Sequence, residues 1–477
     1  MKKYILLIFI AGLLTSCSDF LDLKPEFQIN EKAFYKTAKD FETALIGNYA
    51  NLQVIHNGPL LNVGELTTDN ARIEWSSPTQ AEAEFDELNL SASNSILGSI
   101  WTSCFSTISN SNNLLARLDE VKLTDAQHNQ FKGEALFLRA YNYFYLVRIF
   151  GELPIVPVAF RSPNEIMSFD MSRKPTSEVY NMIIQDLTEA AGLLSGINNT
   201  SKSRASVGAA KTLLGKVYLT SKQYDKARDA LKEVVDMKLY SLSTDYRKLF
   251  TVNNDDLPES IFEIKYLSGN VGEGNSFSSI FSPSRFDLGM FPGNMQGSGR
   301  LIPTPQMANA YEAGDVRRKI SIGDTVRLVS GKYEKEIHGL KFVDFTTGLV
   351  GDGGINFTSL RYADVLLMYA EALNETGNTN AAYAYVNQVR ARAGLTALTG
   401  LSKESFALAM ERERRVEFLL EGHRWFDLVR TERAKEVMNK YFKDAGLSYT
   451  VQDHELIMPI PLREIDIDPK LKQNKGF

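Results

Sequence analysis

The stretch from Gly133 to Gly151 constrains the fold of this chain more than any other. Its sequence, GEALFLRAYNYFYLVRIFG, contains no Pro and only two β-branched residues. A helix is therefore predicted, ending at Gly151, with Pro154 and Pro157 just beyond it. In a helix each residue is rotated by about 100° from the one before it. At this spacing the few polar residues point in scattered directions, with apolar residues between them. A helix without a clean polar face is usually buried on more than one side, so this segment is expected to lie inside a stack of other helices.

The N-terminus has the pattern of a bacterial lipoprotein signal. Two lysines precede an apolar run over residues 4–14, which is shorter than the roughly 20 residues needed to span a bilayer. The sequence LTSC, which ends at Cys17, has the form of a lipobox, in which the Cys carries the lipid. We expect a signal peptide at 1–16, lipid attachment at Cys17 and a lipidated tether at 17–30. An ordinary secretory signal with a chance Cys is the alternative.

Composition limits the classes of partner. The chain contains two cysteines, Cys17 and Cys104, so a lipidated Cys17 leaves Cys104 without an intramolecular partner. Stability must then come from burial of a core, which the length of 477 residues permits. The formal net charge of −5 and the lack of a basic stretch argue against a nucleic-acid partner.

Helical periodicity recurs along most of the chain. Helical patterns are found in four further segments, at 31–53, 96–118, 177–194 and 404–430, and residues 125–149 lead into the central helix. The stretches 205–238 and 362–394 have the tetratricopeptide form, a helix–turn–helix unit of about 34 residues. Small residues such as Gly215 and Ala227 allow paired helices to approach closely. We predict a mainly α fold in which tetratricopeptide-like helix pairs, with the central helix as a degenerate third copy, form a curved scaffold.

Two irregular stretches interrupt the helices. Residues 252–358 hold about half of the chain's Gly residues and several Pro, with short strand-like pieces at 260–266 and 336–343. Residues 62–94 are irregular as well. A loop-rich insert as long as 252–358 in a compact domain is usually functional.

Four sequence blocks together resemble the SusD/RagB family of outer-membrane lipoproteins. The first is the central helix, similar to the family pattern GEAxFLRAxxYFxLVRxFGxxP. The others begin at Arg361 (RYADVLLMYAEA, then VNxVR), at Glu413 (ERRxEFxxEGxRWFDLxR) and at Pro459 (PIPxxEI, then QNxGY), where Phe477 replaces the usual Tyr. The resemblance implies one SusD-like domain over 31–477, with a helical-repeat scaffold and the loop-rich insert.

This resemblance also implies a function. It implies a lipid-anchored protein of the outer membrane that faces the cell exterior, is not an enzyme and needs no cofactor. Such a protein binds oligosaccharides or polysaccharides and delivers them to a SusC-like TonB-dependent transporter. Two alternatives remain open, a peptide-binding cap of such a transporter and a protein-interaction scaffold without a small ligand.

The residues themselves favour binding over catalysis. Glu413 and Glu417 lie one helical turn apart, but three neighbouring arginines would keep both ionised, whereas a glycosidase needs one of its pair protonated. A structural salt-bridge network is therefore predicted. His423 stands alone, and His454 lacks the second His of a zincin motif, so no metal site is predicted.

A sugar site needs flat apolar faces and polar groups on loops. The run from Thr67 to Trp75 offers both, and the insert offers aromatic stretches at 281–286 and 290–294. In the family the ligand site lies on loops of these two regions, with residues that vary. The alternative for the aromatic residues is packing beneath their own loops. The predicted ligand-binding residues are Asp69, Asn70, Arg72, Trp75, Phe281, Arg285 and Phe291.

Overall fold

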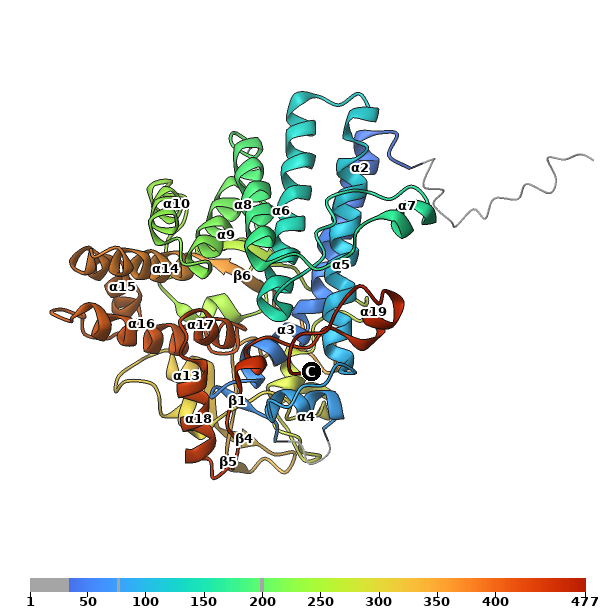
Figure 1. Cartoon of the computed structure of the whole chain (residues 1–477). Coiled ribbons are helices and arrows are strands. Elements are labelled where there is room, and N and C mark those ends of the chain that lie inside the picture. Colours follow the sequence, from blue (N-terminus) through green and yellow to red (C-terminus); the bar gives the residue numbers. More distant parts are fainter. Residues whose placement is uncertain (1–33, 75–77, 198–200) are drawn as a thin grey trace, which may run out of the picture.

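An array of α-helices, in which each helix packs against the next along the chain, forms the body of the computed structural model (Figure 1). The structure describes residues 34–74, 78–197 and 201–477. The array comprises α2 (Ala38–His56), α5 (Ser95–Leu115), α6 (Asp125–Phe150), α8 (Thr176–Leu193), α9 (Val207–Thr220), α10 (Tyr224–Asp236), α14 (Tyr362–Glu375) and α15 (Thr379–Arg392). Figure 1 shows these helices side by side, from α2 on the right to α15 on the left. The predicted mainly α fold, built from helix pairs, is confirmed.

The central helix α6 lies inside this array, as predicted. It packs against α5 and α8 and also contacts α2 and α9. The Thr124 side chain caps its N-terminus, and the helix ends at Gly151, whose φ of 76° few residues other than Gly adopt readily. A Cβ at Gly133 would lie 2.8 Å from the Leu194 side chain, so only glycine permits this approach of α6 to the end of α8.

Buried polar residues of α6 bind side chains of other segments. The carboxylate of Glu134 accepts a hydrogen bond of 2.8 Å from Arg204, which lies just before α9. Arg139 forms an ion pair of 2.7 Å with Asp186 of α8. Because buried charges are costly unless they are paired, these contacts fix the position of α6 relative to its neighbours.

Two helix pairs carry the tetratricopeptide pattern. In the first, α9 and α10 pack together, and a Cβ at Gly215 would lie 2.6 Å from Leu231, which explains why a small residue is needed there. In the second, α14 packs against α15. Helix α10 also packs against α14, so the two pairs lie side by side although more than a hundred residues separate them in sequence.

The C-terminal part differs in detail from its prediction. The helix expected at 404–430 is two helices, α16 (Lys403–Glu417) and α17 (Arg424–Arg430), because the chain turns at Gly422, with a φ of 77°. Two more helices follow, α18 (Ala434–Asp444) and α19 (Leu462–Ile467). The helix predicted at 31–53 begins at Ala38, and residues 31–33 lie outside the described part of the chain.

Short helical turns connect these elements. They are α3 (Pro59–Leu61), η3 (Asn62–Leu66), α4 (Gln80–Asp86), η4 (Leu118–Glu120), α7 (Pro163–Ser168), η5 (Tyr246–Phe250), α11 (Phe277–Ile280), η6 (Pro292–Asn294), α12 (Pro305–Ala308), α13 (Arg318–Ser321) and η7 (Asp453–Leu456). None of the helices within the described ranges has the length and apolar character needed to cross a membrane.

Three small antiparallel sheets shape the loop-rich region. They pair β1 (Ala71–Arg72) with β3 (Ile302–Pro303), β2 (Ser260–Ile264) with β6 (Phe357–Arg361), and β4 (Ile322–Arg327) with β5 (Tyr333–Gly339). The strands predicted at 260–266 and 336–343 overlap β2 and β5. Strand β6 runs directly into α14, so the β2–β6 sheet joins the insert to the helical array.

Candidate functional site

The fold brings together the two irregular stretches on which a binding site was predicted. Strand β1 pairs with β3 of the insert, with Arg72 opposite Ile302. The backbone N–H of Glu74 donates to the carbonyl of Gly299 at 2.8 Å, and the N–H of Gly299 donates to the carbonyl of Ser282 at 2.9 Å. Residues near 74 and residues near 282 therefore flank one shared strand-like segment, although 200 residues of chain lie between them.

Asp69 and Asn70 are turned into the protein. Asp69 is only 6% exposed, and its carboxylate forms ion pairs of 2.9 Å with Arg424 and with Arg415. Burial alone would raise the pKa of Asp69, but the two guanidinium groups hold it below its ordinary value. The Asn70 amide donates to Glu65 and accepts from Arg415, each at 2.9 Å. These contacts occupy both predicted residues and remove them from the candidate ligand surface.

Phe281 and Phe291 are core residues of the insert. Phe281 is fully buried and stacks on Phe277, with ring centroids 5.9 Å apart. Phe291 is buried and stacks on Phe345, with centroids 5.7 Å apart. Both rings therefore support the loops from beneath instead of presenting a face to a ligand, which is the alternative given above for these aromatic residues.

Arg72 and Arg285 remain at the surface, within a group of charged residues. Arg285 forms ion pairs with Asp287 (2.9 Å), Glu334 (2.7 Å) and Glu336 (2.9 Å). Burial and the nearby Glu336 carboxylate raise the pKa of Glu74, against the opposing influence of Arg72 and Arg285. We call Arg72, Glu74, Arg285, Asp287, Glu334 and Glu336 the loop-face cluster.

Aromatic rings lie next to this cluster in the chain. Phe286, which follows Arg285, is 90% exposed, and Tyr333, which precedes Glu334, is 69% exposed. Trp75 follows Glu74 directly but lies outside the described residues. Carboxylates and guanidinium groups can bond sugar hydroxyls, and exposed rings can cover the C–H face of a sugar. Glu74 and Phe286 lie within the two stretches singled out from the sequence but were not among the predicted residues. Tyr333 was missed because an isolated exposed residue carries no pattern in the sequence.

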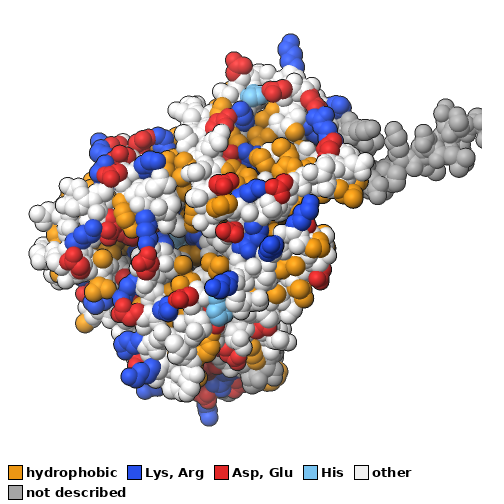
Figure 2. Space-filling view, viewed as in Figure 1, with side chains coloured by type: hydrophobic (Ala, Val, Ile, Leu, Met, Phe, Trp, Pro, Cys, Tyr) orange, Lys and Arg blue, Asp and Glu red, His pale blue; other side chains and the backbone are white. Residues whose placement is uncertain are grey.

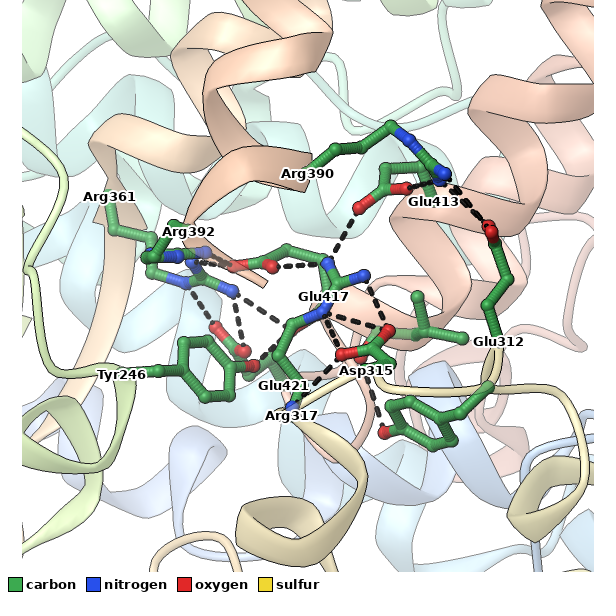
Figure 3. A network of polar contacts seen from close by, with 12 residues as sticks. Tyr246, Glu312, Asp315, Arg317, Arg361, Arg390, Arg392, Glu413, Glu417 and Glu421 are labelled. Atoms are coloured by element: carbon green, nitrogen blue, oxygen red, sulfur yellow. Dashed lines mark hydrogen bonds and ion pairs between the residues drawn. The ribbon is translucent and has the colours of Figure 1, made fainter. Parts of the chain in front are cut away.

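The second group of charges is buried and lies where the insert meets the helices (Figure 3). Glu417 of α16 binds Arg317 at 2.7 Å, Arg361 at 2.6 Å and Arg392. Glu413 binds Arg317 at 2.6 Å. The predicted salt-bridge network is confirmed. We call the group the buried charge cluster, and its members are Glu259, Asp315, Arg317, Arg361, Arg390, Arg392, Glu413, Glu417 and Glu421.

The partners in this network are not those expected from the sequence. Two of the three arginines next to Glu413 along the chain bind elsewhere, with Arg414 on Asp364 and Asp427 and Arg415 on Asp69. Burial raises the pKa of Glu417, but Arg392, Arg361 and Arg317 outweigh it and hold the pKa well below its ordinary value. A carboxylate held in this way cannot serve as a general acid.

Potential metal ligands are scattered through the described part of the chain. Across residues 34–74, 78–197 and 201–477, no three side chains of His, Cys, Asp or Glu are grouped so that they could hold a metal ion. His423 packs against the ring of Phe418, with centroids 4.6 Å apart, and burial holds its pKa well below the ordinary value.

The chain is similar in sequence and in fold to known SusD-like proteins. Residues 332–477 match the SusD family, and residues 19–219 match a family described as "Starch-binding associating with outer membrane". SusD-like protein P2 of Formosa agariphila is 27% identical, covering 99% of each chain. Starch-binding protein SusD of Bacteroides thetaiotaomicron is 26% identical over 76% of this chain and 75% of its own. The solved structure of a laminarin-binding SusD-like protein is 28% identical, with a TM-score of 0.78, and covers 93% of this chain and 100% of its own.

Proposed function

The chain belongs to the SusD family, and from this we propose that it is a non-catalytic glycan-binding protein, anchored by lipid to the outer membrane. In this proposal it faces the cell exterior, captures oligosaccharides and delivers them to a SusC-like TonB-dependent transporter. The observation that carries the binding function is the similarity to the laminarin-binding structure along almost the whole chain.

The loop-face cluster is the proposed ligand surface. Its charged side chains come from β1 and the residues just after it and from two parts of the insert, the loop at 285–287 and strand β5, so several segments present polar groups on one surface. Phe286 and Tyr333 supply exposed rings, and we retain Trp75 as a proposed stacking residue because it directly follows Glu74. Proteins commonly choose ligands through loops held on a rigid scaffold, and this surface has that arrangement.

Calorimetry on the soluble mature chain tests the binding function. The titrants are laminarin and starch oligosaccharides, uncharged and uronic-acid glycans from other sources, and a pool of peptides. Heat from a glycan that is lost on Arg72→Ala supports the proposal, with Ile46→Ala, an exposed change on α2, as the matched control. Binding of peptides alone assigns the cap of a peptide transporter instead, and no heat from any of these titrants favours a protein-interaction scaffold.

Anchoring is tested separately through Cys17. Replacing the lipid-bearing sulfur should release the protein from membranes, because a single segment without its acyl chains has little membrane affinity. Cys17→Ala is therefore expected in the soluble fraction of fractionated cells, while the neighbouring Ser18→Ala stays with the outer membrane. Cys17→Ala that remains in the outer-membrane fraction would show that the anchor lies elsewhere. Co-purification of the transporter with the Ser18→Ala form tests the proposed partnership.

A further inference from the structure

An apolar groove of about 700 Å³ lies between α5, the segment 154–171 that includes α7, and α19, and it shares no lining residue with the loop-face cluster. Met167 on its edge is 80% exposed. Figure 2 shows hydrophobic side chains reaching the surface around α7 and α19, between Lys and Arg side chains. Six of the apolar residues that line the groove are Trp101, Phe105, Ile108, Phe160, Phe169 and Ile467.

Such a surface is costly if water covers it. Contiguous apolar patches on a soluble protein usually mark the place where another segment or molecule binds. Within the described ranges, the residues around the groove leave Met167, Ile166 and Ile467 exposed. The occupant must therefore be a part of the chain outside those ranges or another molecule.

The N-terminal segment has the pattern that this groove requires. From residue 20 to residue 30 the sequence is FLDLKPEFQIN. Every odd position is apolar, and every even position after the first is polar. The odd residues are Leu21, Leu23, Pro25, Phe27 and Ile29. In an extended chain alternate side chains lie on opposite sides, so this segment has one continuous apolar edge of five side chains.

The segment can reach the groove. Tyr35, at the start of the described chain, lies beside Arg117, whose guanidinium carbon is 5.5 Å from the ring centroid. Arg117 follows the end of α5, and Asn112, five residues earlier, lines the groove, which is about 8 Å along the helix. The six chain steps from Ile29 to Tyr35 span about 20 Å when extended, more than the roughly 8 Å along α5 and the 5.5 Å contact together.

We propose that residues 20–29 bind in this groove as an extended strand, with their odd-numbered side chains against α5 and α19. The polar even-numbered side chains then face water. Pro25 cannot donate a backbone hydrogen bond, which fits a segment held by side-chain burial in a groove better than one added to a sheet edge. The proposal is independent of glycan binding, because it depends only on the groove and on the pattern of the segment.

Photo-crosslinking in the full chain tests the proposal. A benzophenone amino acid replaces Met167 at the groove, and in a matched protein it replaces Leu408 on α16, which is 51% exposed. Mass spectrometry is expected to find crosslinks from position 167 to peptides within 18–33 of the same molecule, and none from position 408 to that segment. Crosslinks from position 167 that never include residues 18–33 overturn the proposal.

Paired variants separate the apolar edge from the segment as a whole. Leu23→Asp with Phe27→Asp is expected to reduce the crosslink yield at least tenfold, because two carboxylates would enter an apolar groove. Gln28→Asp with Asn30→Asp adds the same charge on the polar edge and is expected to leave the yield within twofold. Equal yields from both pairs overturn the proposal. So does a crosslink between isotope-labelled and unlabelled molecules, which would make a second copy the occupant.

Discussion

The two charged clusters of this protein are built from the same types of side chain, Arg, Asp and Glu, but they serve opposite purposes. In the buried charge cluster, Glu417 and Arg317 have side chains with no exposed surface and are surrounded by charged partners. In the loop-face cluster, the Arg285 side chain is 24% exposed and that of its partner Glu334 is 50% exposed. Water can therefore replace the Arg285–Glu334 contact but cannot reach the Arg317–Glu417 contact.

The chain positions of the partners explain what each cluster does. Members of the buried charge cluster come from the insert (Arg317), from the end of β6 (Arg361), from α15 (Arg392) and from α16 (Glu417). The cluster therefore holds the loop-rich insert against the helical array. The loop-face cluster lies at the outer surface of that insert, where its groups are free to exchange one hydrogen-bond partner for another.

The largest expected effect is loss of stability when the buried cluster loses one carboxylate. Glu417→Gln leaves three guanidinium groups short of a negative partner in the protein interior. Removing one partner of a buried ion pair costs about 3–5 kcal/mol. The midpoint of urea unfolding should fall accordingly. Glu334→Gln makes the same chemical change at the surface and should cost less than about 1 kcal/mol. Equal losses from the two variants would contradict the contrast between the clusters.

Glu65 is a buried carboxylate without such arginine partners. Its contribution to stability should change with pH in the opposite direction to that of Glu417. Burial raises the pKa of Glu65 to about 7, although Asn70 and the backbone N–H of Gly422 donate to it. The unfolded chain binds this proton near the ordinary value of 4.5. Between those values the folded state holds more protons, so stability falls as pH rises from about 4.5 to 7.

The size of this pH effect follows from the shift. The difference between a pKa of about 7 in the folded state and 4.5 in the unfolded chain corresponds to about 3 kcal/mol of stability between these two pH values. Because other groups titrate too, the measured quantity is the free energy of unfolding of the protein minus that of Glu65→Gln, at several pH values. The difference should decrease with rising pH. A difference that is constant from pH 4.5 to 7 would show that Glu65 keeps an ordinary pKa.

The helical array could be predicted from the sequence because its signals are local. The apolar content of Gly133 to Gly151, its terminal glycine and the absence of a polar face predict a buried helix, and α6 is one. The same holds for the first helix pair, where Gly215 marks the close approach of α9 to Leu231 of α10. The ends of the helices were predicted less accurately. The turn at Gly422, for example, divides a segment that is helical on both sides.

The candidate site could be predicted only in part, because its contacts are distant in sequence. Asp69 and Asn70 lie in a polar run typical of a surface loop, but Arg415 and Arg424, some 350 residues later, bind them inside the protein. Glu417 and its three arginine partners likewise come from four separate segments. A sequence pattern shows which residues are charged and cannot show which of them meet.

The next largest expected effect is a loss of ligand affinity on substitution of Trp75. Trp75→Ala removes a proposed stacking face beside the loop-face cluster and should weaken glycan binding by about 1–3 kcal/mol, because an aromatic ring in a binding site contributes roughly that much burial. Calorimetry gives the affinity and a thermal melt gives the stability of the same variant. A large fall in the melting temperature would instead make Trp75 a packing residue, and the ligand surface would then depend on Phe286 and Tyr333.

The smallest expected effect on stability is at Arg285, and it completes the contrast with Glu417. Arg285→Gln removes ion pairs with Asp287 and Glu334, which are at least half exposed, and with Glu336, whose side chain is 17% exposed. The unfolding free energy should therefore change by less than about 1 kcal/mol. Its guanidinium is proposed to donate to sugar hydroxyls, and a hydrogen bond from a charged group contributes about 1.5–3 kcal/mol. Glycan affinity should therefore fall about tenfold or more while the urea midpoint stays in place. Unchanged affinity in Arg285→Gln would move the ligand surface away from this cluster. A shifted midpoint would mean that Arg285, like Glu417, holds the insert together.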